Sequence, residues 1–455
     1  MLKTKLNNLL LEYTKEKITP QKDEWSFVSD KYEELLSLLE NKNCFQSGSC
    51  ARFTSIKPIN DLDVVWIISD EIKKAINSDT LDLQNVLEDL AKKIEEEYKK
   101  IGVKTIIKPQ THSVGIYFSD NESEFSIDIV PAKNTGQKNE FGDYILEVPE
   151  ILFYSKKNRT KIYKSKKKVD WRKSDPKGYK EEIKKLHEKN DNLRKVIRFL
   201  KKWRWNCKKN YPNFPIKSFH LELIVKDIFE TNNNITFLEA IEEFHKDIME
   251  YFKAPYFLDR ADDNVYVDDY VKDINIFDKN EIHELSKLFL NRLSSLEKID
   301  NNNIDSDIEL LLSARDDEEK FIHDEEFSYT VAINEDINFQ INGKVSLGKR
   351  TKKDTISNYP LRQNNCTVKI GKSIEFYISE DVNMNNCDYY WKVKNRGENN
   401  FQDGIRVPRG EITLNQTYQN PEQTAYNGVH FVECFVINNG KCIAYDRVYV
   451  NIQKN

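Results

Sequence analysis

The sequence predicts a mixed α/β (α+β) chain, in which an α/β lobe and a helical lobe precede an all-β, sandwich-like C-terminal domain. Apolar residues recur at helical spacing through residues 1–43 and again from about 176 to about 320. Between 45 and about 155, apolar strand patterns surround one helical pattern. From about 326, strand-like runs are bounded by Asn and Gly. The predicted domains are therefore residues 1–170, 171–325 and 326–455.

The N-terminal lobe begins with two predicted helices, separated by a break at Ile18-Thr19-Pro20. The alternating pattern that follows predicts a helix at about 80–101 and strands at 63–69, 102–108, 112–118 and 124–131.

Residues 156–173, "KKNRTKIYKSKKKVDWRK", are strongly basic and predict an exposed hairpin or loop. This segment could contact nucleic acid, with Tyr163 and Trp171 as stacking partners, although such stretches are more often solvated hairpins. Beyond it, "YKEEIKKLHEKNDNLRKVIRFLKKWRW" is the clearest amphipathic helical pattern.

The C-terminal region contains the strand-like runs "SIEFYI", "YYWKVK", "HFVECFVI" and "CIAYDRVYVNI". The last two are joined by "NNGK", which is typical of a β-hairpin turn. A length of about 130 residues suits a β-sandwich.

Composition excludes several classes of protein. Hydrophobic residues make up 39% and charged residues 32% of the 455-residue chain, which is polar but well short of a disordered composition. A net charge of −5 gives no support for nucleic-acid binding through bulk charge. Seven cysteines without a C-x-x-C pair indicate neither a thiolate zinc site nor a disulfide framework, which favours a reducing cytosol. We expect a soluble, cytoplasmic protein, because no signal peptide and no apolar run of bilayer length are found.

Two carboxylates mark the beginning of the predicted strand in "INDLDVVWII". Residues two apart in a strand share a face, so Asp61 and Asp63 present their carboxylates together while Leu62 points into the packing. In "SEFSIDIVPA", Asp128 is the only acid in the interior of a later strand. Three such acids suit two Mg²⁺ ions that clamp an in-line displacement at phosphorus. Alone, Asp61-Leu62-Asp63 could equally be a solvated strand entry.

A Gly48-Ser49 turn precedes the Asp61-Leu62-Asp63 pair of acids by about 12 residues. Glycine lets the backbone approach a polyphosphate closely, and backbone N–H groups with the Ser49 hydroxyl can hold phosphate oxygens. A Gly-Ser pair alone is common, but its order with the two later acidic strands is far more selective.

This combination resembles the DNA polymerase β-type nucleotidyltransferase fold. More narrowly, it is similar to the cyclic GMP-AMP synthase-like and 2′-5′-oligoadenylate synthase-like enzymes, the bacterial CD-NTases among them. The resemblance covers roughly residues 20–260 and rests on "GSCARFTSIKPINDLDVV", "SIDIVPA", "LRKVIRFLKKWRWNCKK" and "PIKSFHLELI". It implies that Gly48, Ser49, Lys201 and Ser218 contact the nucleotide triphosphate, and that Asp61, Asp63 and Asp128 are catalytic and ligate two Mg²⁺ or Mn²⁺ ions.

Other interpretations of these residues stay open. Lys201 lies among five other basic residues and could belong to a solvated face, and Ser218 could cap a helix. "YFLDRADDNVYV" departs from the family element, because Arg260 stands where a proline is usual, so no role is transferred there. No His and Cys zinc thumb is present, which argues against activation by DNA through that route.

The C-terminal region resembles the adenylyl/guanylyl cyclase and SMODS C-terminal sensor domain. Trp391, Arg396, Arg409 and His430 are candidates for exposed ligand-binding residues, although Trp391 could instead be sandwich core and the arginines ordinary surface.

The resemblance implies a Mg²⁺-dependent enzyme that joins NTPs into a cyclic di- or oligonucleotide second messenger in bacterial antiphage signalling. The implied partners are NTP substrates, an effector that recognises the product and an unknown ligand of the C-terminal domain; neither nucleic acid nor a membrane is required. Alternatives are linear oligoadenylate synthesis, transfer to RNA or protein, and a non-catalytic nucleotide-binding regulator.

Overall fold

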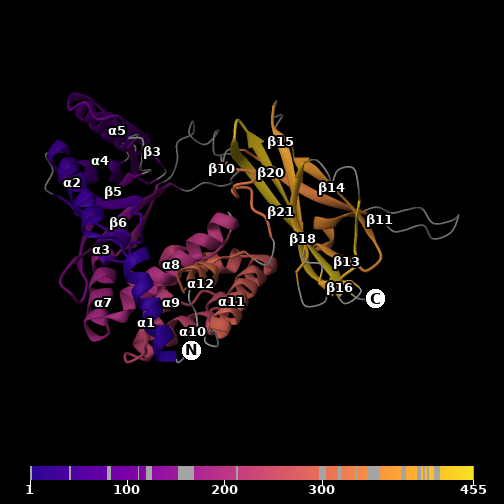
Figure 1. Cartoon of the computed structure of the whole chain (residues 1–455). Coiled ribbons are helices and arrows are strands. Elements are labelled where there is room, and N and C mark those ends of the chain that lie inside the picture. The colour runs from indigo at the N-terminus through magenta and orange to yellow at the C-terminus, as the bar shows by residue number, and fades with distance from the viewer. Residues whose placement is uncertain are drawn as a thin grey trace. The chain divides into compact units, whose positions relative to one another are not determined.

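The structure is a computed structural model, and its chain forms two compact units, Met1–Ala314 and Arg315–Asn455 (Figure 1). The predicted parts 1–170 and 171–325 thus fall largely within one unit, and the C-terminal unit begins about ten residues earlier than predicted. The residues that the structure describes are 3–39, 43–78, 83–110, 112–118, 125–151, 169–211, 214–296, 304–315, 319–333, 337–346, 359–380, 386–396, 401–402, 405–406, 409–414 and 421–453.

A seven-stranded sheet forms the centre of the first unit. Its order is β1-β2-β5-β4-β3, with β6 added to β5 and β7 added to β6. Only the β2–β5 pair is parallel. The strands are β1 (Cys44–Gln46), β2 (Asp61–Ile67), β3 (Thr105–Pro109), β4 (Val114–Phe118), β5 (Ser126–Lys138), β6 (Tyr144–Ile151) and β7 (Val169–Ser174).

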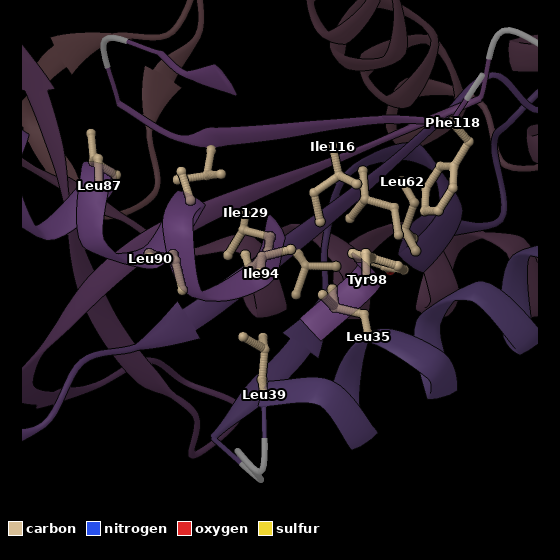
Figure 2. Packing of buried hydrophobic residues seen from close by; sticks show 14 of the residues in the cluster. Leu35, Leu39, Leu62, Leu87, Leu90, Ile94, Tyr98, Ile116, Phe118 and Ile129 are labelled. Carbon is tan, nitrogen blue, oxygen red and sulfur yellow. The ribbon is translucent and has the colours of Figure 1, made fainter. Parts of the chain in front are cut away.

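Helices α2 (Lys22–Leu39) and α5 (Leu83–Lys100) cover one face of this sheet. The core between them combines Leu35 and Leu39 of α2 and Leu87, Leu90, Ile94 and Tyr98 of α5 with sheet residues such as Leu62, Ile116 and Ile129 (Figure 2). Along each strand, the apolar residues that face α2 and α5 alternate with residues that point to the opposite face of the sheet. Helices α2 and α5 do not cover that opposite face.

The predicted elements of this lobe are confirmed, with shifted ends. Strand β2 begins at Asp61, two residues earlier than predicted, and β5 continues seven residues beyond the predicted end at 131. Helix α4 (Asp70–Asn77) is an additional element, and the Ser69 hydroxyl caps it by accepting a hydrogen bond from the Ile72 N–H at 3.4 Å. The predicted N-terminal helices are α1 (Lys3–Tyr13), which continues into the π-helix η1 (Thr14–Ile18), and α2.

The remainder of the first unit is mainly helical, as predicted. Its elements are α3 (Gly48–Arg52), α7 (Pro176–Lys189), α8 (Asn192–Asn210), α9 (Ser218–Thr231), α10 (Phe237–Asp247), η3 (Glu250–Phe252), η4 (Asp269–Asp273), α11 (Ile276–Leu296) and α12 (Ile304–Leu312), with a hairpin of β8 (Leu258–Asp259) and β9 (Asp262–Tyr266). Among the described helices, none is long and apolar enough to cross a bilayer.

The second unit is a β structure built mainly from two sheets, as predicted, with a separate pair β16–β17. One sheet has the order β10-β21-β20-β15-β18 with β13 beside β21, and the other has the order β12-β11-β14-β19. A shared core draws on both sheets, including Ile341, Phe376, Trp391 and Val448, so the sheets pack face to face.

The strands of the second unit are β10 (Thr330–Val331), β11 (Gln340–Ser346), β12 (Tyr359–Pro360), β13 (Thr367–Lys369), β14 (Ser373–Glu380), β15 (Asp388–Lys394), β16 (Phe401–Gln402), β17 (Ile405–Arg406), β18 (Arg409–Leu414), β19 (Glu422–Gln423), β20 (Gly428–Asn438) and β21 (Lys441–Gln453), with η5 (Leu361–Asn364). The predicted "NNGK" hairpin joins β20 to β21. Asn438 pairs with Lys441, and Asn439 and Gly440 both have positive φ.

Candidate functional site

Three carboxylates share the uncovered face of the sheet in the first unit. Parallel pairing of β2 with β5 places Asp63 directly opposite Asp128 and Asp61 opposite Ser126. Leu62, Ile127 and Ile129 are fully buried in the core on the other face. The strand period of two therefore directs all three acids to the same side, as the sequence predicted.

The three acids form one electrostatic group. Burial, together with the charges of Asp61 and Asp128, raises the pKa of Asp63 to about 6. Burial and Asp61 also raise the pKa of Asp128, while His112 and a hydrogen bond from Gln110 act in the opposite direction. The face thus concentrates negative charge that a cation would neutralise.

The chemistry of these side chains fits a hard divalent cation, because carboxylate oxygens are the ligands that Mg²⁺ prefers. Over the described ranges, however, no group of three or more His, Cys, Asp or Glu side chains is gathered into a metal-binding arrangement. Carboxylates without a cation between them repel one another, which opposes such a closed arrangement. Burial is the main cause of the raised pKa of Asp63 and of Asp128, and the charge of Asp61 adds to it.

The Gly48-Ser49 turn lies directly against this group. Gly48 has φ +63°, and a Cβ atom at this position would lie 1.7 Å from Asp63 Oδ2. The backbone N–H of Ser47 donates to the Asp63 carbonyl at 2.8 Å, which ties the turn to β2. The Ser49 and Ser55 hydroxyls are 2.9 Å apart. The structure therefore brings the predicted phosphate-binding turn and the predicted acidic pair together.

Lys201 is buried within α8 and is only 6% exposed, so the interpretation as a solvated lysine is wrong. Its Nζ lies 2.7 Å from Glu222 Oε1 and donates to the Thr54 carbonyl at 3.1 Å. Burial lowers the pKa of Lys201, an effect that the Glu222 carboxylate opposes. The lysine is thus held beside the loop that leads from α3 to β2.

Arg52 and Glu222 complete this buried cluster, and the sequence analysis missed both. Arg52 Nε and Nη2 donate to Glu222 Oε2 and Oε1 at 2.9 and 3.1 Å. Although burial opposes ionisation, Arg52 and Lys201 together lower the pKa of Glu222 to about 2. A signal was present, because Glu222 is the single acid in the apolar helical run "FHLELIV".

Ser218 is the first residue of α9 and is half-buried. The N-cap residue of this helix is Lys217, and its side chain makes no capping hydrogen bond, so Ser218 is not the cap that one interpretation expected. The turn before the helix is held by Tyr270, whose hydroxyl accepts a hydrogen bond from the Lys217 N–H at 3.1 Å.

Other predicted residues lie in different settings. Tyr163 and most of the basic segment fall outside the described residues. Trp171 is in β7, where Lys133 Nζ lies 3.7 Å from the ring centre. Arg260 pairs with Glu140, Glu182 and Asp175, so it joins the β8–β9 hairpin to α7 and to the turn between β5 and β6.

The four candidates in the second unit are mostly not exposed. Trp391 is 2% exposed and belongs to the sandwich core, which confirms the alternative interpretation for this residue. Arg396 and His430 are also buried, and the Arg396 N–H donates to His430 Nδ1. Arg409 is partly exposed and pairs with Glu411 and Glu422. Expecting exposed side chains here was wrong for Trp391, Arg396 and His430, because Trp391 packs into the sandwich core and the strand that carries His430, β20, is buried along most of its length.

The outer face of β15, β20 and β21 carries a buried ionic network that the sequence analysis did not find. Lys392 Nζ lies 2.8 Å from Glu319 Oε1 and 2.7 Å from Glu433 Oε2, and all three side chains are fully buried. Arg447 Nη2 lies 2.6 Å from Glu433 Oε1. Glu319 comes from the segment that leads into the sheets, so this segment is pinned onto the second unit.

Comparison with known proteins extends these observations. Residues 5–190 match the Second Messenger Oligonucleotide or Dinucleotide Synthetase domain, and residues 316–453 match the Adenylyl/Guanylyl and SMODS C-terminal sensor domain. The chain is 28% identical over 206 residues to the cyclic AMP-AMP-AMP synthase of Escherichia coli (strain MS 115-1), which is 45% of this chain and 55% of that protein. It therefore spans about half the length of this curated relative.

Two solved structures share the fold. The E. coli MS115-1 CdnC:HORMA-deltaN complex has a TM-score of 0.51 and 17% identity, over 68% of this chain and 96% of that chain. E. coli MS115-1 CdnC with ATP has a TM-score of 0.50 and 17% identity, over 68% and 98%. At this identity the similarity concerns the fold alone.

Proposed function

Because the chain is a CD-NTase with a C-terminal sensor domain, we propose that it is a Mg²⁺-dependent nucleotidyltransferase. In this proposal it joins nucleoside triphosphates into a cyclic di- or oligonucleotide and releases pyrophosphate. The printed activity of the curated relative makes ATP the first substrate to test. A role in antiphage signalling in the bacterial cytoplasm is supported by the resemblance to bacterial CD-NTases.

The observation that carries this proposal is the shared face of β2 and β5. Asp63 and Asp128 are paired in register, Asp61 lies on the same face, and Gly48 leaves no room for a side chain between the turn and Asp63. A backbone that approaches an acidic cluster this closely can bring a triphosphate beside it. A solvated strand entry would need neither the register nor the missing Cβ atom.

In the proposed reaction, Gly48 and Ser49 bind the triphosphate of the first nucleotide, and Lys201 and Ser218 contact it from α8 and α9. A ribose hydroxyl of the second nucleotide attacks the α-phosphorus, its proton passes toward Asp128, and pyrophosphate leaves. Divalent cations held by Asp61, Asp63 and Asp128 would supply charge neutralisation at the phosphates and acidify the attacking hydroxyl. Repetition with exchanged roles closes the ring.

We assign the second unit to ligand-dependent control of this activity. Support comes from the match to a sensor domain over residues 316–453. The sensor ligand and the effector that reads the product are the implied partners.

The test is mass spectrometry of the products formed from a mixture of the four NTPs with Mg²⁺, before and after phosphatase treatment. A cyclic product lacks a terminal phosphate, so its mass is unchanged by phosphatase. A linear product would lose its terminal phosphates, so its mass would fall. That result would identify the enzyme as a linear oligoadenylate synthase and not as a cyclase. Transfer to added RNA or protein would identify a different acceptor. NTP binding without any product would indicate a non-catalytic regulator.

A further inference from the structure

The amide of Gln110 contacts Asp128 on the same face of the sheet as Asp61 and Asp63, but from the β4 side of β5. Strand β5 lies between β2 and β4, so Asp128 has the acidic pair on one side and the β3–β4 edge on the other. Gln110 follows directly after β3, and its Nε2 donates to Asp128 Oδ1 at 3.2 Å. This contact is the one hydrogen bond to the Asp128 carboxylate that the described residues record.

The Gln110 side chain is itself held at both ends. Its Oε1 accepts a hydrogen bond from the Ser113 hydroxyl at 2.8 Å, and its Nε2 also donates to the Tyr117 hydroxyl at 2.9 Å. The backbone closes the same turn, because the Gln110 N–H donates to the Ser113 carbonyl at 2.7 Å. The oxygen and the nitrogen of the Gln110 side-chain amide therefore both have hydrogen-bond partners, which fixes the orientation of the amide and of its Nε2–H bonds.

The sheet makes room for this amide by placing a glycine opposite Asp128. Gly115 is the cross-strand partner of Asp128, and a Cβ atom at position 115 would lie 2.6 Å from Gln110 Nε2. Val114 and Ile116 on either side of Gly115 point into the core. Gly115 and Tyr117 consequently share the face of the three acids, and the amide occupies the space over Gly115.

We propose that Gln110 is a positioning residue for Asp128, which orients the carboxylate toward Asp61 and Asp63 for binding of a divalent cation and of the attacking hydroxyl. The inference rests on the proposed function, in which Asp128 is a metal ligand and proton acceptor. Ser113 and Tyr117 act through Gln110 and touch no substrate. Groups that orient metal ligands typically contribute about 10- to 100-fold to metal affinity or activity.

The decisive variant is Gln110→Met, which keeps the length of the side chain and removes both hydrogen-bonding groups. Electron paramagnetic resonance of Mn²⁺ bound to the nucleotide-free protein should show affinity about ten-fold weaker than in the wild type. With ATP and Mg²⁺, kcat should fall while KM for ATP stays unchanged, because Gln110 contacts no triphosphate-binding residue. Gln137→Met, at an exposed position of β5, the strand that carries Asp128, should bind Mn²⁺ like the wild type.

Ser113→Ala separates positioning from a purely structural role in the turn. It removes the turn hydrogen bond but leaves Nε2 free to reach Asp128, so its Mn²⁺ affinity should fall less than that of Gln110→Met. Equal losses in the two variants would show that Gln110 only holds the turn, and Mn²⁺ affinity of Gln110→Met equal to that of the wild type would overturn the proposal. If Gln110→Met does not fold, Tyr117→Phe removes one partner of Nε2 at an exposed ring, and unchanged Mn²⁺ affinity there overturns it equally.

The Mn²⁺ measurement also separates this inference from the proposed function. A wild-type protein that forms no nucleotide product, with a Gln110→Met variant that binds Mn²⁺ more weakly, would overturn the function and keep the positioning role. If the wild type forms product and Gln110→Met binds Mn²⁺ with unchanged affinity, the proposed function is kept and the positioning role of Gln110 is overturned. A wild type that neither forms product nor binds Mn²⁺ would overturn both.

Discussion

At the scale of single residues, the contact between Gly48 and Asp63 is the tightest constraint in the site. The chain turns at Gly48 with positive φ, and the Asp63 carboxylate occupies the space where a Cβ atom would stand. The positive φ of Gly48 and its close contact with the Asp63 carboxylate are separate requirements for glycine, so they can be tested separately. Gly102 offers the comparison, because it has φ +75° and nothing within 4 Å of a built Cβ atom.

We expect Gly48→Ala to lower product formation by about 100-fold or more, because it displaces Asp63 or the turn by a distance that catalysis does not tolerate. Gly102→Ala carries the same strain of a positive φ, about 1 kcal/mol, and should leave activity unchanged. Initial rates of pyrophosphate release measure both variants. Equal rates for the two would show that the close contact between Gly48 and Asp63 is not required for catalysis.

Asp63→Asn should abolish product formation without lowering the melting temperature of the metal-free protein. The wild-type carboxylate is buried beside Asp61 and Asp128, which raises its pKa to about 6, so its negative charge disfavours the folded state near neutral pH. A neutral amide of the same shape removes that repulsion. Asp30→Asn on the exposed side of α2 is the control and should change neither property. A marked fall in melting temperature for Asp63→Asn would instead indicate a structural role.

At the scale of elements, Glu222 joins three helices that are distant in sequence. It extends from α9 and binds Arg52, the last residue of α3, and Lys201 of α8. The Gly48-Ser49 turn forms the start of α3, so the same carboxylate holds both the turn and the predicted phosphate-binding lysine. The cluster is almost completely buried, which makes each of its charges dependent on the others.

Glu222→Gln should lower the free energy of unfolding of the first unit by about 3–5 kcal/mol, because it leaves two buried cations without their shared anion. Glu230→Gln on the same helix removes an exposed pair with Lys226 and should cost about 0–1 kcal/mol. Urea unfolding followed by tryptophan fluorescence measures both. Similar losses in the two variants would contradict a structural role for the buried cluster.

The stability difference between wild type and Glu222→Gln should depend on pH. The folded-state pKa of Glu222 is about 2 and lies below its ordinary value of 4.5, so the ionised carboxylate stabilises the folded state. This contribution is complete above about pH 4.5 and is lost as the pH falls toward 2. The difference in unfolding free energy should therefore shrink over this interval. A difference that stays constant from pH 5 to pH 2 would show that Glu222 is not held ionised.

At the scale of the whole molecule, the division after Ala314 separates the site from the sensor unit. The sequence placed the boundary at 325/326, within a segment that packs on the sheets of the second unit through Glu319, Phe321 and Ile322. Local strand patterns begin only after this segment, so periodicity alone could not assign it. Its attachment depends on contacts with β15 more than 70 residues later, including the 2.8 Å contact from Lys392 to Glu319.

We expect residues 315–455 to fold as an isolated fragment, whereas residues 326–455 should be less stable. The shorter fragment lacks Glu319, a partner of the fully buried Lys392, and loss of one member of a buried pair costs about 3–5 kcal/mol. Thermal unfolding by circular dichroism compares the two fragments. Equal melting temperatures would show that the segment contributes nothing to the second unit.

A chain that ends at Ala314 should retain the whole candidate site and form product without regulation by a sensor ligand. The full chain should respond to its activating ligand, and the shortened chain should not. To measure the response, product formation by each chain is compared without extract, with extract of uninfected bacteria and with extract of infected bacteria. An identical response in both chains would remove the second unit from regulation.

The sequence by itself determined the acidic face, the glycine turn and the "NNGK" hairpin. Each depends on local rules: a period of two along a strand, the space that glycine leaves, and the turn that two residues of positive φ allow. Asp61, Asp63 and Asp128 could therefore be identified before their strands were paired. Only the tertiary structure decided how Lys201 is held, where Trp391 and Arg396 lie, and that Gln110 reaches Asp128. Those outcomes depend on packing between residues far apart in the chain, such as the 170 positions between Arg52 and Glu222, and local periodicity contains no information about such pairs.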